Sequence, residues 1–90
     1  MPLDIFRSSS FKSDFKKLDN EGKERLKLVL SVLINEEPLD QKFKNHQLIG
    51  NYCGCYECHL KPDLLLIYKI EKDTNEILLV RIGSHSQLFK

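Results

Sequence analysis

The sequence predicts a small α+β domain, in which a small antiparallel sheet has an N-terminal strand and carries a two-helix hairpin packed on one face. Two observations indicate this class. Apolar residues recur at helical spacing between residues 11 and 35, whereas from residue 46 onward the apolar pattern is that of extended strands. The chain has 90 residues with 41% hydrophobic content, enough for one modest core. We therefore expect residues 1–90 to form a single domain.

The N-terminal half is expected to contain a short strand followed by two helices. Residues 3–6 include the apolar side chains of a possible strand. Phe11, Phe15 and Leu18 then follow at intervals of four and three, behind a run of serines that can cap a helix. Residues 21–35 repeat apolar positions at i, i+3, i+4 and i+7, which is the pattern of a longer amphipathic helix. The two helices are expected to form a hairpin.

The C-terminal half is expected to fold as three antiparallel strands. Residues 56–60 alternate in polarity, while residues 64–70 and 77–82 are nearly continuous apolar runs. Turn-forming residues at 61–63 and 72–75 separate the three segments. With both helices on one side, the other face of this sheet should be free.

Charge and terminal composition narrow the class of protein. The 14 basic and 13 acidic side chains give a formal charge of +1, so any phosphate-binding site must be local. The N-terminus lacks the apolar core of a signal peptide, and no apolar run approaches the roughly 20 residues needed to cross a bilayer. We expect a cytoplasmic protein that does not bind membranes. Three cysteines crowded into residues 53–58 are typical of reduced thiols rather than of a disulfide framework.

Strand alternation predicts which polar side chains share a surface. Glu57 and His59 should lie on the face away from the helices, because side chains alternate with period two. The same rule puts Arg81 on that face and, if the strand continues, His85 as well. For the last strand, the alternation rule predicts that Leu78, Val80 and Ile82 face the core. It predicts that Ile77 and Leu79 lie on the open face.

Three ordered motifs carry a family resemblance: KNHQLIG at 44–50, ECHLKPDLLLIYKI at 57–70 and LLVRIGSHSQLF at 78–89. Together they closely resemble the YafQ-type toxins of the RelE/ParE superfamily, over nearly the whole chain. The resemblance implies a small antiparallel sheet packed on a helical hairpin. It also implies the toxin of a bacterial type II toxin-antitoxin pair, an endoribonuclease that cuts mRNA, typically in the ribosomal A site. A cognate antitoxin would silence it, so the chain would be a monomer when free or part of a toxin-antitoxin hetero-oligomer.

The resemblance also implies a set of functional positions. By position they are His46, Glu57, His59, Asp63, Arg81, His85 and Phe89. One departure is Tyr56, which stands where the family commonly has an arginine before the acid. Because alternation turns Tyr56 toward the core, its counterpart in the family can be structural.

These residue types suit RNA cleavage without a metal or other cofactor. The 2′-hydroxyl must lose a proton, the departing 5′-oxygen must gain one, and the charge on the phosphorane must be stabilised. Our hypothesis makes His85 the general acid and His59 or Glu57 the general base, with Arg81 on the phosphate oxygens. Asp63 would orient a histidine.

Two further positions complete the hypothesis. His46 would be a second base or a substrate-positioning group. Phe89 offers a ring on which an unstacked base can lie, a contact worth roughly 1–3 kcal/mol in single-strand binders.

Ordinary structural roles compete with these assignments. His46 is compatible with an exposed loop, Asp63 with a turn, and Phe89 with a plug of the core at the chain end. Arg81 is compatible with a cross-strand ion pair to Glu57.

Two other functions remain open at this point. A zinc-stabilised binding module could use Cys53, Cys55 and Cys58 with His59 or His46, although Cys58 and His59 should point to opposite faces of a strand. A ParE-like toxin would share the superfamily fold and inhibit DNA gyrase without cutting nucleic acid. The histidines beside Glu57 and Asp63 favour the nuclease, since a binder needs no matched acids and bases.

Overall fold

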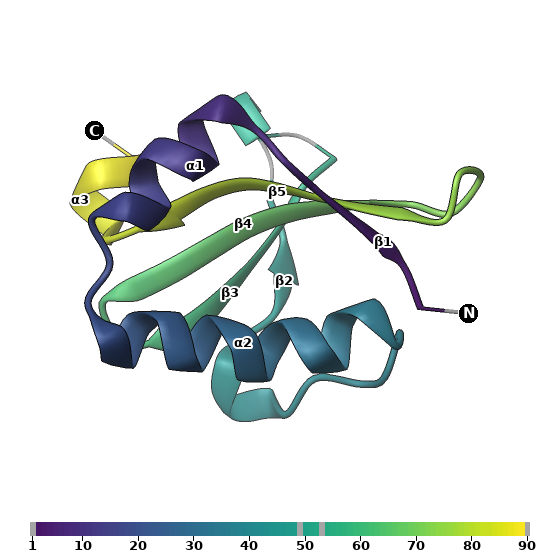
Figure 1. The fold of residues 1–90 in the computed structure, drawn as a ribbon, viewed down its shortest axis with the longest axis horizontal. Coiled ribbons are helices and arrows are strands. Elements are labelled where there is room, and N and C mark those ends of the chain that lie inside the picture. Colours follow the sequence, from purple (N-terminus) through teal and green to yellow (C-terminus); the bar gives the residue numbers. More distant parts are fainter. Residues whose placement is uncertain (1, 49, 53, 90) are drawn as a thin grey trace.

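The computed structural model describes residues 2–48, 50–52 and 54–89. The strands form one sheet in the order β1-β5-β4-β3-β2, with α2 lying along the sheet and α1 beside β5 (Figure 1). The elements in chain order are β1 (Asp4–Arg7), α1 (Ser9–Lys16), α2 (Asn20–Ile34), β2 (His46–Gln47), β3 (Tyr56–Lys61), β4 (Leu64–Glu71), β5 (Glu76–Gly83) and α3 (His85–Leu88), with short 3₁₀ turns at Gln41–Phe43 and Gly50–Tyr52. The α+β class and the two N-terminal helices are confirmed.

The sheet is mixed rather than wholly antiparallel. β1 runs parallel to β5, with Asp4 opposite Glu76 and Arg7 opposite Leu79, whereas β2, β3, β4 and β5 pair antiparallel. A parallel pair requires a long crossover, which α1, α2 and the antiparallel strands provide. The antiparallel pairing predicted for the three C-terminal strands is confirmed. Local apolar patterning does not encode which strand a distant segment joins, so the sequence did not predict the parallel direction of β1.

Both N-terminal helices begin at side-chain caps. The Ser8 hydroxyl accepts a hydrogen bond from the Phe11 N–H at 3.0 Å, and the Asp19 carboxylate accepts one from the Gly22 N–H at 2.7 Å. Each cap satisfies a backbone donor that the first helical turn leaves without an intrahelical partner. The caps therefore fix where the chain leaves β1 and where it turns from α1 into α2.

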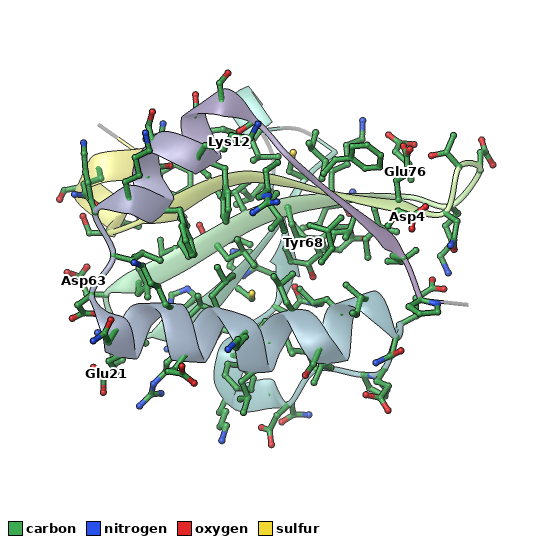
Figure 2. The ribbon with its side chains drawn as sticks, in the orientation of Figure 1. Asp4, Lys12, Glu21, Asp63, Tyr68 and Glu76 are labelled. Atoms are coloured by element: carbon green, nitrogen blue, oxygen red, sulfur yellow. The ribbon has the colours of Figure 1, made fainter. Side chains whose placement is uncertain are left out.

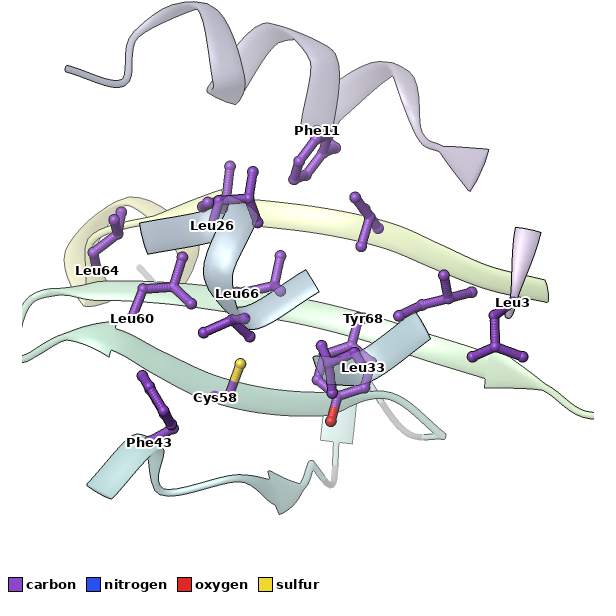
Figure 3. Packing of buried hydrophobic residues seen from close by; sticks show 14 residues of the cluster. Leu3, Phe11, Leu26, Leu33, Phe43, Cys58, Leu60, Leu64, Leu66 and Tyr68 are labelled. Atoms are coloured by element: carbon purple, nitrogen blue, oxygen red, sulfur yellow. The ribbon is translucent and has the colours of Figure 1, made fainter. Parts of the chain in front are cut away.

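The main core lies between the helices and one face of the sheet. Figure 3 shows side chains of α1 and α2 meeting those of the central strands. Its buried members include Phe11, Leu26, Leu33, Phe43, Cys58, Leu60, Leu66 and Tyr68. The hydroxyl of Tyr68 donates a hydrogen bond to the Asn45 side-chain oxygen at 2.6 Å, so this buried polar group is satisfied.

Tyr56 departs from its expected place in that core. It lies opposite Tyr68 in the register of β3 and β4, and the two rings stack with centroids 5.8 Å apart. Its side chain is nevertheless 37% exposed, because it stands at the rim of the helix-covered face. The alternation rule correctly predicted the sheet face on which Tyr56 lies, but it did not predict that Tyr56 stands at the edge of the core.

A bulge in β5 changes which of its apolar residues are buried. The register shifts at Ile67 and Tyr68, which face Arg81 and Leu79 respectively, so Val80 has no direct partner on β4. Consequently Ile77 and Leu79 are in the main core, together with Ile82. The expectation that Ile77 and Leu79 lie on the open face is wrong, while Arg81 lies on that face as alternation predicts.

We expected the sheet face opposite α2 to be free. This expectation is wrong, because a second apolar cluster covers part of that face. Its buried members are Cys55, Leu65, Ile67 and Leu88, and Leu48, Tyr52, Val80 and Phe89 pack against them. α3 supplies Leu88, so the C-terminal helix, which sequence analysis did not predict, closes over the sheet. Within the described part of the chain, no helix combines the length and apolar character needed to span a membrane.

Candidate active site

A buried carboxylate with two histidine neighbours lies on the sheet face opposite α2. Glu57 on β3 is only 5% exposed. Its Oε1 atom lies 3.4 Å from Nε2 of His46 and 3.4 Å from Nε2 of His59. A carboxylate removed from water in this way needs hydrogen-bonding or charged partners, which His59 can supply through an N–H and His46 can supply when it is protonated.

The backbone of β2 and β3 produces this arrangement. His46 is directly opposite Glu57 in the antiparallel register, and His59 follows Glu57 by two residues on the same face. His46 is therefore part of a short strand rather than a loop, although its side chain is 52% exposed. Its Nδ1 lies 2.8 Å from the Lys44 carbonyl oxygen, and since a carbonyl only accepts, Nδ1 must donate. Neutral His46 then carries its lone pair on Nε2, the atom nearest Glu57.

Arg81 lies in the same row of side chains as Glu57. Ile67 on β4 is paired with Glu57 on one side and with Arg81 on the other. The next row contains His59, Leu65 and Gly83. Acid, histidine and arginine thus surround a buried apolar floor, and the absence of a side chain at Gly83 lets Gln87 and Leu88 pack closely against β5.

The ion-pair partner of Arg81 is Asp14 on α1, rather than Glu57 as one reading of the sequence expected. Arg81 Nε donates to Asp14 Oδ2 at 2.7 Å, and Nη2 donates to Oδ1 at 3.1 Å. These hydrogen bonds raise the pKa of Arg81, and Tyr52 raises it further. Arg81 is therefore a cation at physiological pH, held in place by this pairing.

α1 reaches Arg81 because it lies along the part of the β5 edge that β1 leaves unpaired. β1 pairs with β5 only as far as Leu79. Beyond that point Ser8 Oγ donates to the Val80 carbonyl at 2.6 Å, and Asp14 Oδ2 accepts from the Ile82 N–H at 3.1 Å. Side chains of α1 thus replace the missing neighbouring strand.

His85 and Phe89 come from the short helix α3. Their rings are 5.0 Å apart between centroids, and Phe89 meets Tyr52 edge to face at 5.7 Å. Phe89 is half-buried against the second cluster, so it both closes that cluster and offers part of a ring to solvent. His85 is exposed.

The capping of α3 orients its first residue, His85. Ser84 Oγ accepts a hydrogen bond from the Gln87 N–H at 3.3 Å. Gln87 Oε1 in turn accepts one from the Ser84 N–H at 2.8 Å. The two bonds form a capping box, which joins β5 to α3 through a defined turn.

Asp63 lies in the turn that joins β3 to β4. It is exposed there, at the same end of the molecule as Glu21 (Figure 2). There it lines a polar cavity of about 470 Å³ together with Lys17, Lys61 and Arg81. The carboxylate beside His46 and His59 is that of Glu57, and the orienting role expected of Asp63 stays a prediction.

The cysteines divide between the two faces. Cys58 is fully buried in the main core, and burial, with a smaller effect from the charge of Glu57, raises its pKa to about 12. Cys55 is buried in the second cluster, and Cys53 lies outside the described residues. Among residues 2–48, 50–52 and 54–89, no group of three His, Cys, Asp or Glu side chains is arranged to hold a metal ion.

Sequence reasoning missed Asp14 and Tyr52. Asp14 carried a signal, because it follows Phe11 by three residues and therefore lies on the stripe that faces the sheet. A charged residue at a core-facing position needs a partner. Tyr52 carried no comparable signal, since its contact with Phe89 depends on the folding of two separate segments.

Comparisons with known proteins show the family and fold to which the chain is similar. Residues 3–90 match the family model described as the bacterial toxin of type II toxin-antitoxin system, YafQ. The mRNA interferase toxin YafQ of Escherichia coli strain K12 is 36% identical over 90 residues, covering 96% of this chain and 95% of the relative. A metal-bound toxin from Helicobacter pylori superposes with a TM-score of 0.86 at 44% identity, covering 97% of this chain and 99% of that one. YafQ in the E. coli DinJ-YafQ complex gives a TM-score of 0.83 at 31% identity, covering 98% and 99%.

Proposed function

Because this chain belongs to the YafQ family of toxins from bacterial type II toxin-antitoxin systems, we propose that it is an endoribonuclease that cleaves mRNA on the ribosome and so inhibits translation in the cytoplasm. The observation that carries the proposal is the buried Glu57, whose Oε1 lies 3.4 Å from both His46 and His59. Arg81 in the same row supplies a cation. Curated relatives named as mRNA interferase toxins support the same activity.

The first step is removal of the 2′-hydroxyl proton by the group around Glu57. In neutral His46 the Nε2 lone pair is available, since Nδ1 donates to Lys44. When an imidazole accepts the proton it becomes a cation, and the side chain of Glu57 lies against it. The buried carboxylate therefore stabilises the proton-transfer product of either His46 or His59, in a site of low dielectric constant where such an interaction is strong.

The 2′-oxygen then attacks the adjacent phosphorus, and the bond to the 5′-oxygen breaks. His85 donates a proton to that departing oxygen, and Arg81 stabilises the charge that develops on the non-bridging oxygens. Phe89 provides a ring surface for a base next to the cleaved bond. The products are an RNA ending in a 2′,3′-cyclic phosphate and an RNA beginning with a 5′-hydroxyl.

Cleavage by side-chain variants tests this proposal. We expect His85→Ala, His59→Ala and Glu57→Gln each to lower the rate of mRNA cleavage by about 10²- to 10⁴-fold. Asp73→Asn, in the exposed turn between β4 and β5, is the control. Undiminished cleavage by His85→Ala would remove its role, and a 5′-phosphate on the product would contradict attack by the 2′-hydroxyl.

A comparison of substrates tests the place of action. One message is offered as naked RNA and again on translating ribosomes. The formal charge of +1 provides little general attraction for phosphates, so we expect efficient cleavage only on the ribosome. Expression that halts DNA replication without cutting mRNA would instead indicate a gyrase inhibitor.

We further propose that the cognate antitoxin occupies an apolar groove between β1, α1 and α2. The groove has a volume of about 500 Å³, and its walls include Ile5, Phe15 and Leu30. Ile5 is 42% exposed and lies on the edge strand β1. An exposed apolar surface at a sheet edge is typical of a protein interface.

The charged residues at the rim of this groove indicate which kind of partner it would bind. Arg7, Lys23 and Lys27 line it, against the single acid Glu24. An amphipathic antitoxin segment with acidic residues beside its apolar ones matches both features. Binding there would give a toxin-antitoxin hetero-oligomer, with the free toxin a monomer.

Charge reversal tests the groove. Arg7→Glu combined with Lys27→Glu should slow association with the antitoxin and weaken its salt dependence, because rim charges act mainly on encounter. Lys42→Glu, on the 3₁₀ turn at Gln41–Phe43, is the matched control. Unchanged binding by the double variant would place the antitoxin elsewhere.

A further inference from the structure

The pairing between Arg81 and Asp14 is side-on. Asp14 takes Nε and Nη2 of the guanidinium, at 2.7 and 3.1 Å. A guanidinium has five N–H donors in a rigid plane, so this pairing leaves both N–H groups of Nη1 and one of Nη2. Tyr52 also hydrogen-bonds the guanidinium, so the N–H groups that neither Asp14 nor Tyr52 engages remain for the oxygens of a phosphate.

Asp14 is itself held in place. Its Oδ2 atom also accepts the Ile82 N–H at 3.1 Å, which ties the carboxylate to the strand that carries Arg81. The side chain of Asp14 is only 13% exposed, and that of Arg81 is 27% exposed. Water competes little for the pair, and the long arginine side chain has little freedom to move away from this orientation.

An unrestrained arginine would behave differently. It would have to adopt one of many rotamers when substrate binds, at a cost in conformational entropy. A pairing that holds the side of the guanidinium removes that cost before binding, for a residue that shares a row with Ile67 and Glu57. Preorganisation of a cation counts most when charge develops in the transition state.

We infer that Asp14 is a positioning residue for RNA cleavage, which holds the guanidinium of Arg81 side-on so that its remaining N–H groups meet the phosphate. The inference rests on the proposed function, because it assigns Arg81 to the phosphorane. It adds a residue from α1 to a site otherwise built from β2, β3, β5 and α3.

Kinetics of matched variants test the inference. Asp14→Asn removes the charge and retains one acceptor oxygen, and we expect kcat to fall by up to about 10²-fold with KM little changed. Asp73→Asn makes the same chemical change on the exposed β4–β5 turn and should retain the full rate. An Asp14→Asn variant with the kcat of the unaltered protein would overturn the inference.

A double-variant comparison separates positioning from a general structural role. In an Arg81→Lys background, which lacks the fork, Asp14→Asn should cause no further loss of kcat in single-turnover cleavage. An equal loss in both backgrounds means that Asp14 acts independently of Arg81 and refutes the inference. If Arg81→Lys alone leaves cleavage unchanged, the failure lies with the role proposed for Arg81 itself.

A measurement on the unaltered protein does not depend on how the variants fold. The Nε–H of Arg81 should exchange with water more slowly than that of Arg7, which is exposed on β1. Asp14→Asn should abolish the difference. Equal exchange at the two arginines in the unaltered protein would show that the side-on pair does not persist in solution.

Discussion

Glu57 and Cys58 are neighbours on β3, and both are buried, yet they have opposite consequences for the protein. Cys58 is 0% exposed among apolar side chains of the main core, while Glu57 is 5% exposed on the other face. Burial keeps the thiol protonated, with a pKa raised to about 12. Glu57 instead has two imidazoles 3.4 Å away. Alternation along one strand thus separates an inert ionisable group from one that can take part in chemistry.

The difference teaches that burial alone does not make an ionisable residue functional. A thiol can enter an apolar core as a small hydrophobic group because it is neutral near pH 7. A carboxylate enters only with partners, and here the partners are themselves groups that exchange protons. The composition of each face therefore decides which of the two neighbours can act.

The sharpest test removes each neighbour in turn. Glu57→Gln keeps the shape of the side chain and should lower kcat for mRNA cleavage by about 10²- to 10⁴-fold. Cys58→Ala should leave kcat within about 3-fold of the starting value, although it loses core packing. Cleavage assays below the melting temperature of both variants make the comparison. A larger loss of kcat in Cys58→Ala than in Glu57→Gln would reverse the assignment of the two faces.

The central strand β4 allows a comparison in which burial is equal. Leu66 faces the helices and Ile67 faces the second cluster, and each is 0% exposed. Either residue changed to alanine should cost about 2–5 kcal/mol of unfolding free energy. Only Ile67→Ala should also lower kcat, because Ile67 stands between Glu57 and Arg81. Thermal unfolding gives the first quantity, and cleavage at a temperature where both variants are folded gives the second.

Local pattern and long-range placement differ in how far the sequence could predict them. Alternation correctly paired Glu57 with His59 on one face, because both lie in one unbroken strand. It failed for Ile77 and Leu79, since a bulge at Val80 reverses the phase of β5 and depends on the pairing with β4.

Placement between distant segments was less accessible. The parallel docking of β1, the pairing of β2 and the contact of Asp14 with Arg81 join residues far apart in the chain. The sequence contains the residue types of the site, but the geometry that assembles them arises from strand order.

The loss of stability at alkaline pH is a smaller expected effect, and it reports on Cys58 in the main core. The pKa of Cys58 rises from 9.0 to about 12 on folding, so between these values the unfolded chain loses the proton while the folded protein retains it. Stability is unaffected below about pH 9 and falls as pH rises, by about 2 kcal/mol at about pH 10.5. Cys58→Ala should lack this part of the pH dependence. Denaturant titrations of both proteins at several pH values measure it, and parallel curves would show that Cys58 does not contribute.

The smallest expected effect concerns α3, the helix that covers part of the sheet face on which Glu57 lies. Gln87 completes the capping box with Ser84, and its side chain folds back over Gly83, where an added Cβ would lie 2.6 Å from Gln87 Oε1. Gln87→Ala should destabilise α3 by about 1 kcal/mol. If His85 acts from the intact turn, the fraction of protein with His85 in place then falls, and kcat should drop by about 5-fold or less.

Gln41→Ala makes the same substitution on an exposed 3₁₀ turn outside the site and should leave both quantities unchanged. Amide hydrogen exchange over residues 85–88 reports the opening of α3, and cleavage of ribosome-bound mRNA reports its consequence. Faster exchange in Gln87→Ala without loss of kcat would mean that His85 does not need an ordered α3. The functional face would then consist of the strand residues alone, with Leu88 serving only to cover Leu65 and Ile67.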